Sequence, residues 1–556
     1  MRWLNEYSQK FLENGYLLPG ESVETRVMLM AQTAEKILGK SGWAKKFYDY
    51  MEKGYYVPPS PVWANFGVER GLPISCFGSY VSDNMGSILY AQAEVGMMSK
   101  FGGGSSGYFG ALRPRGSAIK DNGTSSGAVH FMSLFESLVD VVSQGSVRRG
   151  HFSPYLPVEH ADIEEFLKIG TEGNKIQKLT HGVTVGDKWL QEMVAGDEKK
   201  RGIWAKIIES RTMMGYPYIL FTDNANNGTV EAYKDKGYKI HASNMCTEIM
   251  LPSKEDWSFV CNLSGMNLLY YDEWKNTDAV ETLVEFLDAV MTEFITKLEK
   301  LRDSSDPVDQ QSFYFMQRAH KFAIENRAVG LGALGWHSYL QSRMIPFASP
   351  EARALNKEIF SFIKDRAYAS SAQLAKDYGE PEVMKGYGRR NATLMAIAPN
   401  TSSGFIIGQV SQGIEPWWSN CYVKDLAKIK VTIKNTELEK LLETKGQNTR
   451  DVWQSIRDHD GSAQHLECLS GEEKAVFKTF SEINQYAILD QAADRQKFID
   501  QGQSLNLMVN PKTPAKDVNA LYLEAWKLGI KSLYYQHSKS AAQELSRKIV
   551  CVGCEA

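Results

Sequence analysis

Residues 216–250 read YPYILFTDNANNGTVEAYKDKGYKIHASNMCTEIM, and the fold prediction starts from this stretch. Its first six residues form an apolar run and predict a buried strand. On either side of this stretch, apolar spacing predicts helices at 87–101, 128–142, 278–300 and 351–379, and another strand at 392–399. The glycine-rich residues 102–110 predict a flexible loop. Strands that alternate with helices over most of a chain are typical of an α/β architecture.

The two ends of the chain differ from this alternation. Apolar spacing predicts that residues 1 to about 55 are helical, up to a proline-rich break at 57–61. The apolar pattern fades again from about residue 540. We therefore expect three segments: a helical region at 1–58, the main α/β domain at 59–540 and a flexible tail at 541–556.

Composition excludes several classes of protein. The 556 residues are 43% hydrophobic and 23% charged, as in ordinary globular proteins. A net charge of −3 argues against binding to nucleic acid or to an anionic membrane. No run approaches the roughly 20 apolar residues of a membrane span, and polar residues interrupt the N-terminus where a signal peptide needs its apolar run. We expect a cytoplasmic protein whose cysteines are thiols by default.

The cysteines point to redox chemistry. They are Cys76, Cys246, Cys261, Cys421, Cys468, Cys551 and Cys554. The first three lie in apolar, strand-like surroundings, and the last two form a Cys-x-x-Cys pair at the chain end, where thiols serve no hydrophobic core. This distribution indicates a protein that moves reducing equivalents. Structural zinc is the main alternative for the terminal pair, but such a site usually needs a second close pair of Cys or His.

One short motif places three reactive groups together. Asn244, Cys246 and Glu248 alternate within NMCTEI, so in an extended segment their side chains would point to the same side. They would supply an amide, a redox-capable sulfur and a general base. An ordinary strand with one buried cysteine would give the same six letters.

A second motif, TLMAIAPNTSSGFIIGQVSQGIEP at 393–416, predicts a strand that breaks at Pro399 into a polar turn. Backbone N–H groups and hydroxyls at such a turn can hold phosphate, although a simple helix cap would look alike. Adjacent tyrosines in KSLYYQ at 531–536 matter only if a redox path ends near a thiol. The GxGxxG match at 330–335 lacks the flanking strand and acidic residue of a dinucleotide site, and we set it aside.

Six motifs in one order resemble the large subunit of class I ribonucleotide reductase. They are the Ser-Cys at 75–76, NMCTE at 244–248, the cysteine at 261, PNTSS at 399–403, LYYQ at 533–536 and the terminal CxxC. The likeness runs from about residue 15 to the end. It implies a ten-stranded α/β barrel of two five-stranded halves, with Cys246 on a central finger loop. It also implies the reduction of ribonucleotides, as diphosphates, to 2′-deoxyribonucleotides for DNA synthesis.

The resemblance assigns roles residue by residue. Cys246 would be the transient thiyl radical that takes the 3′ hydrogen of the ribose, with Glu248 as base on the 3′ hydroxyl and Asn244 bound to the substrate. Cys76 and Cys261 would be the reducing pair that ends as a disulfide. Two further pairs complete the path: Tyr534 and Tyr535 would relay the radical, and Cys551 and Cys554 would re-reduce the disulfide.

The same likeness supplies binding sites. The substrate positions are Ser60, Ser75, Gly104, Pro399, Asn400, Thr401, Ser402 and Ser403. The positions that match a nucleotide effector site are Asp83, Arg113, Gln144, Arg148 and Arg149. We expect no metal site and no bound cofactor in this chain. Its partners would be a metal-bearing, radical-generating small subunit, a thioredoxin or glutaredoxin, and a nucleoside triphosphate effector.

The chain departs from the family at its N-terminus. About 60 residues precede Ser60, too few for the N-terminal cone that binds ATP or dATP in many relatives, so we expect no on–off control by dATP. Whether specificity control and the homodimer persist stays open. One alternative is an adenosylcobalamin-dependent class II reductase, which the paired tyrosines disfavour. A class III glycyl-radical enzyme lacks support, because the C-terminus shows no glycine-radical motif. The third alternative is a non-catalytic metal-binding protein on the same fold.

The tail yields the first prediction. Replacing Cys551 and Cys554 together by serine should stop turnover with thioredoxin, because the barrel disulfide could no longer be exchanged. The variant should still complete roughly one reduction, or continue with dithiothreitol. Product formed per chain, measured with each reductant, checks this; full turnover with thioredoxin would contradict it.

Overall fold

The computed structural model describes residues 1–538, except residues 75, 146–148 and 427–428 and the side chains of 425–430. Five parallel strands form one half of its central sheet: β2 (Cys76–Tyr80), β3 (Gly104–Tyr108), β6 (Phe152–Pro157), β7 (Gly182–Val185) and β8 (Tyr218–Phe221). Parallel neighbours need crossover connections. Helices supply them: α5 (Met85–Lys100), α6 (Ala128–Val141), α7 (Ile163–Phe166), α8 (Asp187–Ala195) and α9 (Glu198–Met214).

A second set of parallel segments forms the other half. β9 (Phe259–Asn267) pairs with β10 (Val329–Leu334), Leu331 bridges to Met395, and Ile397 bridges to Gln503. Beyond Gln503, β13 (Leu507–Met508) pairs in parallel with β15 (Gln536–His537). This half therefore runs through β9, β10, the segment around 394–397, the segment at 503–508 and the segment at 532–537.

Two antiparallel contacts close the ring. β2 pairs with β9 at one junction, and β14 (Ser532–Leu533) pairs with β8 at the other. Five parallel segments on each side, joined antiparallel at both seams, make the expected ten-stranded α/β barrel, which is confirmed. β1 (Tyr56–Val57) adds an outer antiparallel contact to β9.

Glycine explains both a wrong prediction and a correct exclusion. Residues 102–110 are not a loop, because 104–108 form β3. Glycine is needed within this strand: a Cβ on Gly107 would lie only 2.7 Å from the Phe152 ring. Tertiary packing of aromatic rings thus overrides the local preference of glycine. The GxGxxG match lies in and just after β10, where a Cβ on Gly332 would sit 2.6 Å from the carbonyl oxygen of Ala396.

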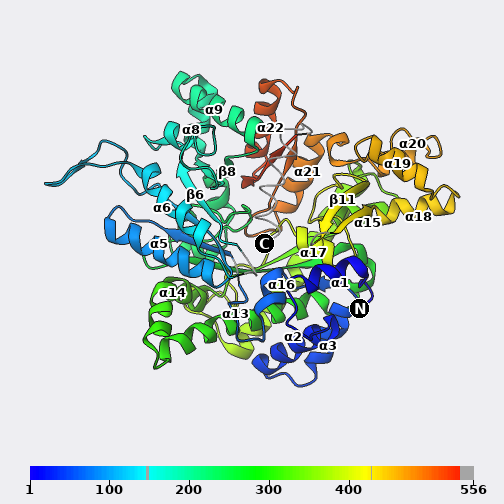
Figure 1. The fold of residues 1–556 in the computed structure, drawn as a ribbon, viewed down its shortest axis with the longest axis horizontal. Helices are drawn as coiled ribbons and strands as arrows, with labels where there is room; N and C mark the ends of the chain where they lie inside the picture. Colours follow the sequence, from blue (N-terminus) through cyan, green and yellow to red (C-terminus); the bar gives the residue numbers. More distant parts are fainter. Residues whose placement is uncertain (75, 146–148, 427–428, 539–556) are drawn as a thin grey trace.

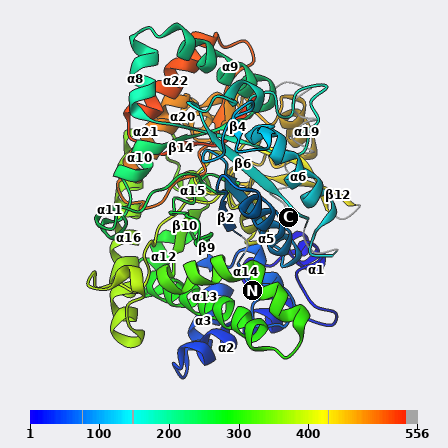
Figure 2. The same cartoon turned by 90° about the vertical axis from the view of Figure 1, so that its left-hand side faces the viewer.

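Helices cover the outside of the barrel. The predicted helices at 87–101, 128–142, 278–300 and 351–379 appear as α5, α6, α13 (Ala279–Asp303) and α16 (Pro350–Tyr378). In Figures 1 and 2, α2 (Val23–Leu38) and α3 (Trp43–Glu52) lie at the opposite end of the molecule from α8, α9 and α22 (Ala515–Lys527). The boundaries at 58 and 540 remain predictions. No helix in the described ranges is long and apolar enough to cross a membrane.

The remaining elements connect these layers or lie at the periphery. The helices are α1 (Glu6–Glu13), α4 (Ser60–Asn65), α10 (Thr222–Asn227), α11 (Glu231–Asp235), α12 (Tyr271–Trp274), α14 (Pro307–Asn326), α15 (Trp336–Ser342), α17 (Thr401–Ile406) and α21 (Gln485–Gln496). At one side of Figure 1, a small separate core forms from β11 (Cys421–Leu426), α18 (Thr436–Thr444), α19 (Arg450–Asp458) and α20 (Gly471–Val476). β12 (Ile429–Lys434) pairs with β11, and β4 (Ala118–Ile119) with β5 (Gly123–Thr124).

A buried ion-pair network ties the long helix α13 to the second half of the barrel. Asp288 accepts hydrogen bonds from Arg327 Nε and Arg390 Nε, each at 2.9 Å, and from Asn391 Nδ2 at 3.2 Å. Burial raises the pKa of this carboxyl, but the two guanidinium groups outweigh it and hold the pKa below its ordinary value. Asp288 is therefore ionised and shared by two cations.

Asp288→Asn should lower the free energy of unfolding by about 3–5 kcal/mol, because it leaves buried guanidinium groups without an anion. Asp272→Asn is the matched control: this carboxylate pairs with Arg343 and Lys275 at the surface, and its loss should cost less than about 1 kcal/mol. Denaturant unfolding of both variants checks the prediction. Equal effects would contradict a structural role for the buried network.

Candidate active site

A loop passes from α11 into the barrel and carries Asn244, Cys246 and Glu248. We call residues 243–250 the finger loop. The alternation of these three residues had predicted an extended segment. The loop instead turns at 245–247, with Thr247 in the left-handed region at φ 66°. The prediction was wrong because the loop bonds to partners far away in sequence: Gly502 N–H donates to the Glu248 carbonyl at 2.8 Å, and Ser532 Oγ to the Thr247 carbonyl at 2.8 Å.

The turn nevertheless points the three predicted side chains into one cavity of about 150 Å³. Six elements line it: α4, β2, β3, β9, the finger loop, and the segment at 398–403 that runs into α17. The lining residues are Pro59, Ser60, Pro61, Cys76, Gly104, Asn244, Met245, Cys246, Glu248, Leu263, Ala398, Pro399, Asn400, Thr401, Ser402 and Ser403. All the predicted substrate positions are thus brought together except Ser75, which lies outside the described residues.

The polar turn at 399–403 lines one end of the cavity. Asn400 adopts the left-handed conformation at φ 55°, and its side-chain amide donates to the carbonyl of Ala333 at 3.0 Å, which fixes the turn against β10. Helix α17 begins directly after it, at Thr401. The first N–H groups of a helix lack partners within the helix, so this end of the cavity suits an anionic group such as phosphate.

Cys246 lies next to a tyrosine. The Tyr534 hydroxyl donates to Cys246 Sγ at 3.6 Å. Tyr535 follows with a ring centroid 4.3 Å from that of Tyr534. Tyr218, on β8, packs against both rings, and its hydroxyl bonds that of Tyr535 at 2.8 Å. These aromatic rings form one buried cluster that ends at the sulfur.

Glu248 is a buried carboxyl that lines the same cavity as Cys246. Its side chain is 1% exposed. Burial raises the pKa of Glu248 to about 7, although hydrogen bonds from its own backbone, Asn244 and Ser504 lower it. Ser504 Oγ lies 3.0 Å from Glu248 Oε2. A carboxyl with this pKa can accept or release a proton near neutral pH.

Cys76 and Cys261 face each other across a seam of the barrel. They are Cα partners in the antiparallel pairing of β2 with β9. Such partners lie about 4.5–5.5 Å apart, within the range that a disulfide spans. Asn244 Nδ2 donates to Cys76 Sγ at 3.9 Å, which connects this pair to the finger loop. Burial raises the pKa of the Cys261 thiol well above its ordinary value.

The other predicted positions are only partly brought together. Asp83 and Arg113 form a half-exposed ion pair at 2.8 Å, whereas Gln144 donates to Asn65 Oδ1 at 3.1 Å and Arg149 is exposed. Arg148, Cys551 and Cys554 lie outside the described residues. In the part of the chain that the structure describes, no group of three or more His, Cys, Asp or Glu could hold a metal ion.

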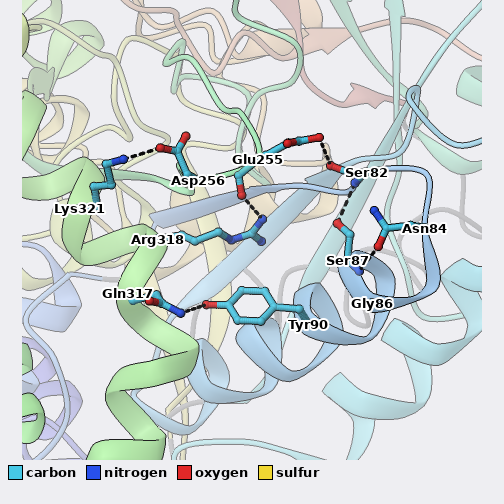
Figure 3. Close-up of a pocket in the computed structure, with 10 residues that line it drawn as sticks. All are labelled: Ser82, Asn84, Gly86, Ser87, Tyr90, Glu255, Asp256, Gln317, Arg318 and Lys321. Atoms are coloured by element: carbon cyan, nitrogen blue, oxygen red, sulfur yellow. Dashed lines mark hydrogen bonds and ion pairs between the residues drawn. The ribbon is translucent and has the colours of Figure 1, made fainter.

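A larger cavity of about 570 Å³ lies elsewhere, between α5 and α14 (Figure 3). Its charged groups already bind each other or nearby backbone: Lys321 pairs with Asp256, and Arg318 donates to the carbonyl of Glu255 at 3.1 Å and pairs with Glu94. Because these groups are satisfied, volume alone does not make this cavity the candidate site. The smaller one holds the thiols and the carboxyl.

Sequence reasoning missed several residues that contact the predicted ones, among them Tyr218 and Ser504. Tyr218 lies in the strand YPYILF and Ser504 in FIDQGQSLNL, and neither stretch signals a partner by itself. Both meet their partners across more than 250 residues. The one local signal for Tyr218 is the spacing of Tyr216 and Tyr218, two tyrosines two residues apart in YPYILF. Residues two apart in a strand point to the same side of the sheet.

Comparisons with known proteins agree on one family. Residues 2–71 match the model for the ribonucleotide reductase all-alpha domain, and residues 74–200, 195–386 and 380–536 match the model for the barrel domain. A putative ribonucleoside-diphosphate reductase large subunit of Frog virus 3 is 37% identical over 530 residues, 91% of this chain and 90% of the relative. The large subunit of Invertebrate iridescent virus 3 is 32% identical over 89% and 88% of the two chains.

One solved structure is similar over nearly its whole length. It is described as the class Id ribonucleotide reductase alpha subunit of Actinobacillus ureae, with a TM-score of 0.90, 53% identity and 99% of each chain covered.

The buried carboxyl yields a prediction on stability. The pKa of Glu248 in the folded chain is about 7, above its unfolded value. Its contribution to the free energy of unfolding is therefore fully present below about pH 4.5 and is lost as the pH rises through 7. Glu248→Gln removes that loss, because glutamine stays neutral at every pH. At about 1.4 kcal/mol per pKa unit, the variant should be more stable than the parent by about 3 kcal/mol at pH 8. At pH 4.5 the two should be equally stable.

Denaturant unfolding at both pH values measures this difference, with Glu209→Gln on the exposed face of α9 as the control that should show none. A Glu248→Gln variant as stable as the parent at pH 8 would show that the carboxyl is not strained by burial.

Proposed function

The chain belongs to the ribonucleotide reductase large-subunit family, and on this basis we propose which of its residues perform the reduction. The enzyme reduces ribonucleotides to 2′-deoxyribonucleotides, the precursors of DNA. The names of the relatives support nucleoside diphosphates as its substrates. The assignment to the cytoplasm stays a prediction from the sequence.

A single contact carries the proposal for the mechanism: the Tyr534 hydroxyl lies 3.6 Å from Cys246 Sγ, in a cluster that also holds Tyr535 and Tyr218. A nucleophilic thiol needs a base or a cation beside it to form a thiolate. A phenol supplies neither, but it can exchange a hydrogen atom with sulfur. The contact with Tyr534 therefore suits one-electron chemistry on the sulfur.

The proposed steps balance as follows. The Cys246 thiyl takes the hydrogen from C3′ of the ribose and becomes a thiol, which leaves the radical on C3′. Glu248, with its pKa near 7, accepts the proton of the 3′ hydroxyl. The 2′ hydroxyl leaves as water with a proton from the reducing pair. Cys76 and Cys261 provide two electrons and two protons in total and become a disulfide. Cys246 then returns its hydrogen to C3′ and is a thiyl again, while Glu248 returns its proton to the 3′ oxygen and is a carboxylate again.

The substrate would lie with its phosphates against the start of α17. Asn400, Thr401, Ser402 and Ser403 form this end of the cavity, while Cys246 and Glu248 form the other. Ser60 and Gly104 line the same space and would contact the nucleotide between the two ends. Fixing the phosphates in this way positions the ribose at the sulfur, which is the main contribution a binding loop can make to rate.

Partners and regulation are proposals of the same kind. A radical-generating small subunit would oxidise the tyrosine path from outside, and thioredoxin or glutaredoxin would recharge Cys551 and Cys554. The ion pair of Asp83 with Arg113 supports an effector site only in part, since Gln144 contacts Asn65 instead. A nucleotide effector, specificity control and the homodimer therefore rest on the family resemblance.

Neither alternative function gains support. The similar proteins named above are large or alpha subunits, and the solved structure is described as class Id, which gives no ground for a cobalamin-dependent class II enzyme. Turnover of this chain with adenosylcobalamin and no partner protein would reverse that conclusion. A non-catalytic metal-binding protein is disfavoured because Cys76, Asn244, Cys246 and Glu248 all line the same cavity.

The thiyl role has a direct test. Cys246→Ser should abolish deoxynucleotide formation, because an oxygen radical cannot be generated and recovered as a sulfur radical can, while nucleotide binding should persist. Cys468→Ser, outside the barrel, is the matched control and should keep full activity. Product formation with the small subunit and nucleotide affinity by calorimetry separate the two effects. Normal turnover of Cys246→Ser would refute the radical role.

A further inference from the structure

Gln501 lies at the junction between the reducing pair and the finger loop. It belongs to the segment that leads into the 503–508 strand, and its side chain is completely buried. Its backbone is fixed on both sides: Gln501 N–H donates to the carbonyl of Met395 at 3.1 Å, and its carbonyl accepts from Lys531 Nζ at 2.6 Å. The side chain therefore starts from a rigid position.

The orientation of the side-chain amide is fixed by its neighbours. Gln501 Oε1 accepts from the backbone N–H of Met250, on the finger loop, at 3.2 Å. Gln501 Nε2 donates to the carbonyl of Val329, on β10, at 3.1 Å, and to Thr393 Oγ1 at 3.0 Å. A backbone N–H can only donate and a carbonyl can only accept, so the opposite orientation of the amide would lose both bonds.

In this orientation the amide nitrogen also reaches a catalytic sulfur. Gln501 Nε2 lies 3.4 Å from Cys261 Sγ, so its two N–H groups are shared among three acceptors: this sulfur, the Val329 carbonyl and Thr393 Oγ1. Burial, Cys76, Glu248 and Asp500 all raise the pKa of this thiol, whereas the hydrogen bond from Gln501 lowers it. A neutral amide can stabilise negative charge on sulfur without burying a permanent cation in the barrel.

The contact between Gln501 and Cys261 should differ between the reduced pair and the disulfide. β9 lies between β2, which carries Cys76, and β10, whose Val329 carbonyl holds the Gln501 amide. To form a disulfide, Cys261 Sγ has to come within about 2 Å of Cys76 Sγ, on the β2 side. The contact with Gln501 is therefore made in the reduced pair and weakened in the disulfide.

We propose that Gln501 is the positioning residue of the Cys76–Cys261 pair: its amide holds the Cys261 sulfur in the reduced state and ties it to the finger loop that carries Cys246. The inference rests on the proposed function, in which the pair supplies two electrons and two protons as its S–S bond forms. Gln501 itself neither gains nor loses atoms or electrons.

The reduction potential of the pair tests this directly and needs no small subunit. Full-length chain with Cys551→Ser and Cys554→Ser, so that the tail cannot exchange, is equilibrated with mixtures of reduced and oxidised dithiothreitol. Alkylation followed by peptide mass spectrometry gives the fraction of Cys76–Cys261 disulfide. Gln501→Met, which has similar volume and no donor, should shift this equilibrium about tenfold toward the disulfide, which is about 30 mV for two electrons.

Controls separate this effect from damage to the fold. Gln503→Met is the matched control, because Gln503 is equally buried two residues along but donates to the Ala492 carbonyl and Gln496 Oε1, away from both thiols. It should leave the potential unchanged. If Gln501→Met does not fold, Gln501→Asn, whose amide is one methylene shorter and withdrawn from the sulfur, should shift the equilibrium in the same direction.

The outcomes are distinguishable. A potential in the folded Gln501 variants equal to that of the parent would overturn the role of Gln501 while leaving the reducing pair intact. A shift of the same size in Gln503→Met would also overturn it. If the parent chain forms no Cys76–Cys261 disulfide in any buffer, the proposed function of the pair fails instead.

Discussion

The finger loop brings polar backbone groups into the interior of a barrel, where each of them must find a hydrogen-bond partner. That requirement organises the site. The second half of the barrel supplies most of the partners, from Gln501, Gly502, Ser504 and Ser532, while Tyr155 of β6 donates to the carbonyl of Asn244 from the first half. The loop is thus bound to both halves, and its turn at Cys246 is fixed at their centre.

The same segment that closes the barrel also carries the two tyrosines of the proposed radical path. β14 pairs with β8 at the seam, and the next two residues are Tyr534 and Tyr535. Register at this seam therefore sets the distance from the Tyr534 hydroxyl to Cys246. The remaining chemistry depends on exclusion of water. Glu248, at 1% exposure, has a pKa near 7 because it is buried. The proposed thiyl radical would be protected from side reactions in the same cavity.

Local sequence patterns predicted the helices well, because α5, α6, α13 and α16 carry their own apolar periodicity. They failed where distant contacts decide. β3 was taken for a loop, since only the aromatic rings of neighbouring strands explain its glycines. The finger loop was taken for an extended segment, since its turn is held by residues some 250 positions later. The motifs located Asn244, Cys246 and Glu248, but Tyr218, Ser504 and Gln501 act through partners that no local pattern encodes.

The central claim is that Cys246 works through one-electron exchange with Tyr534. The rate of deoxynucleotide formation by Tyr534→Phe, with saturating small subunit and nucleotide, tests it most directly. Tyr534 is not among the residues that line the substrate cavity, and the substitution removes the hydroxyl that lies 3.6 Å from the sulfur. Tyr534→Phe should show no turnover above background, with nucleotide affinity unchanged. Turnover of Tyr534→Phe at the parent rate would contradict it.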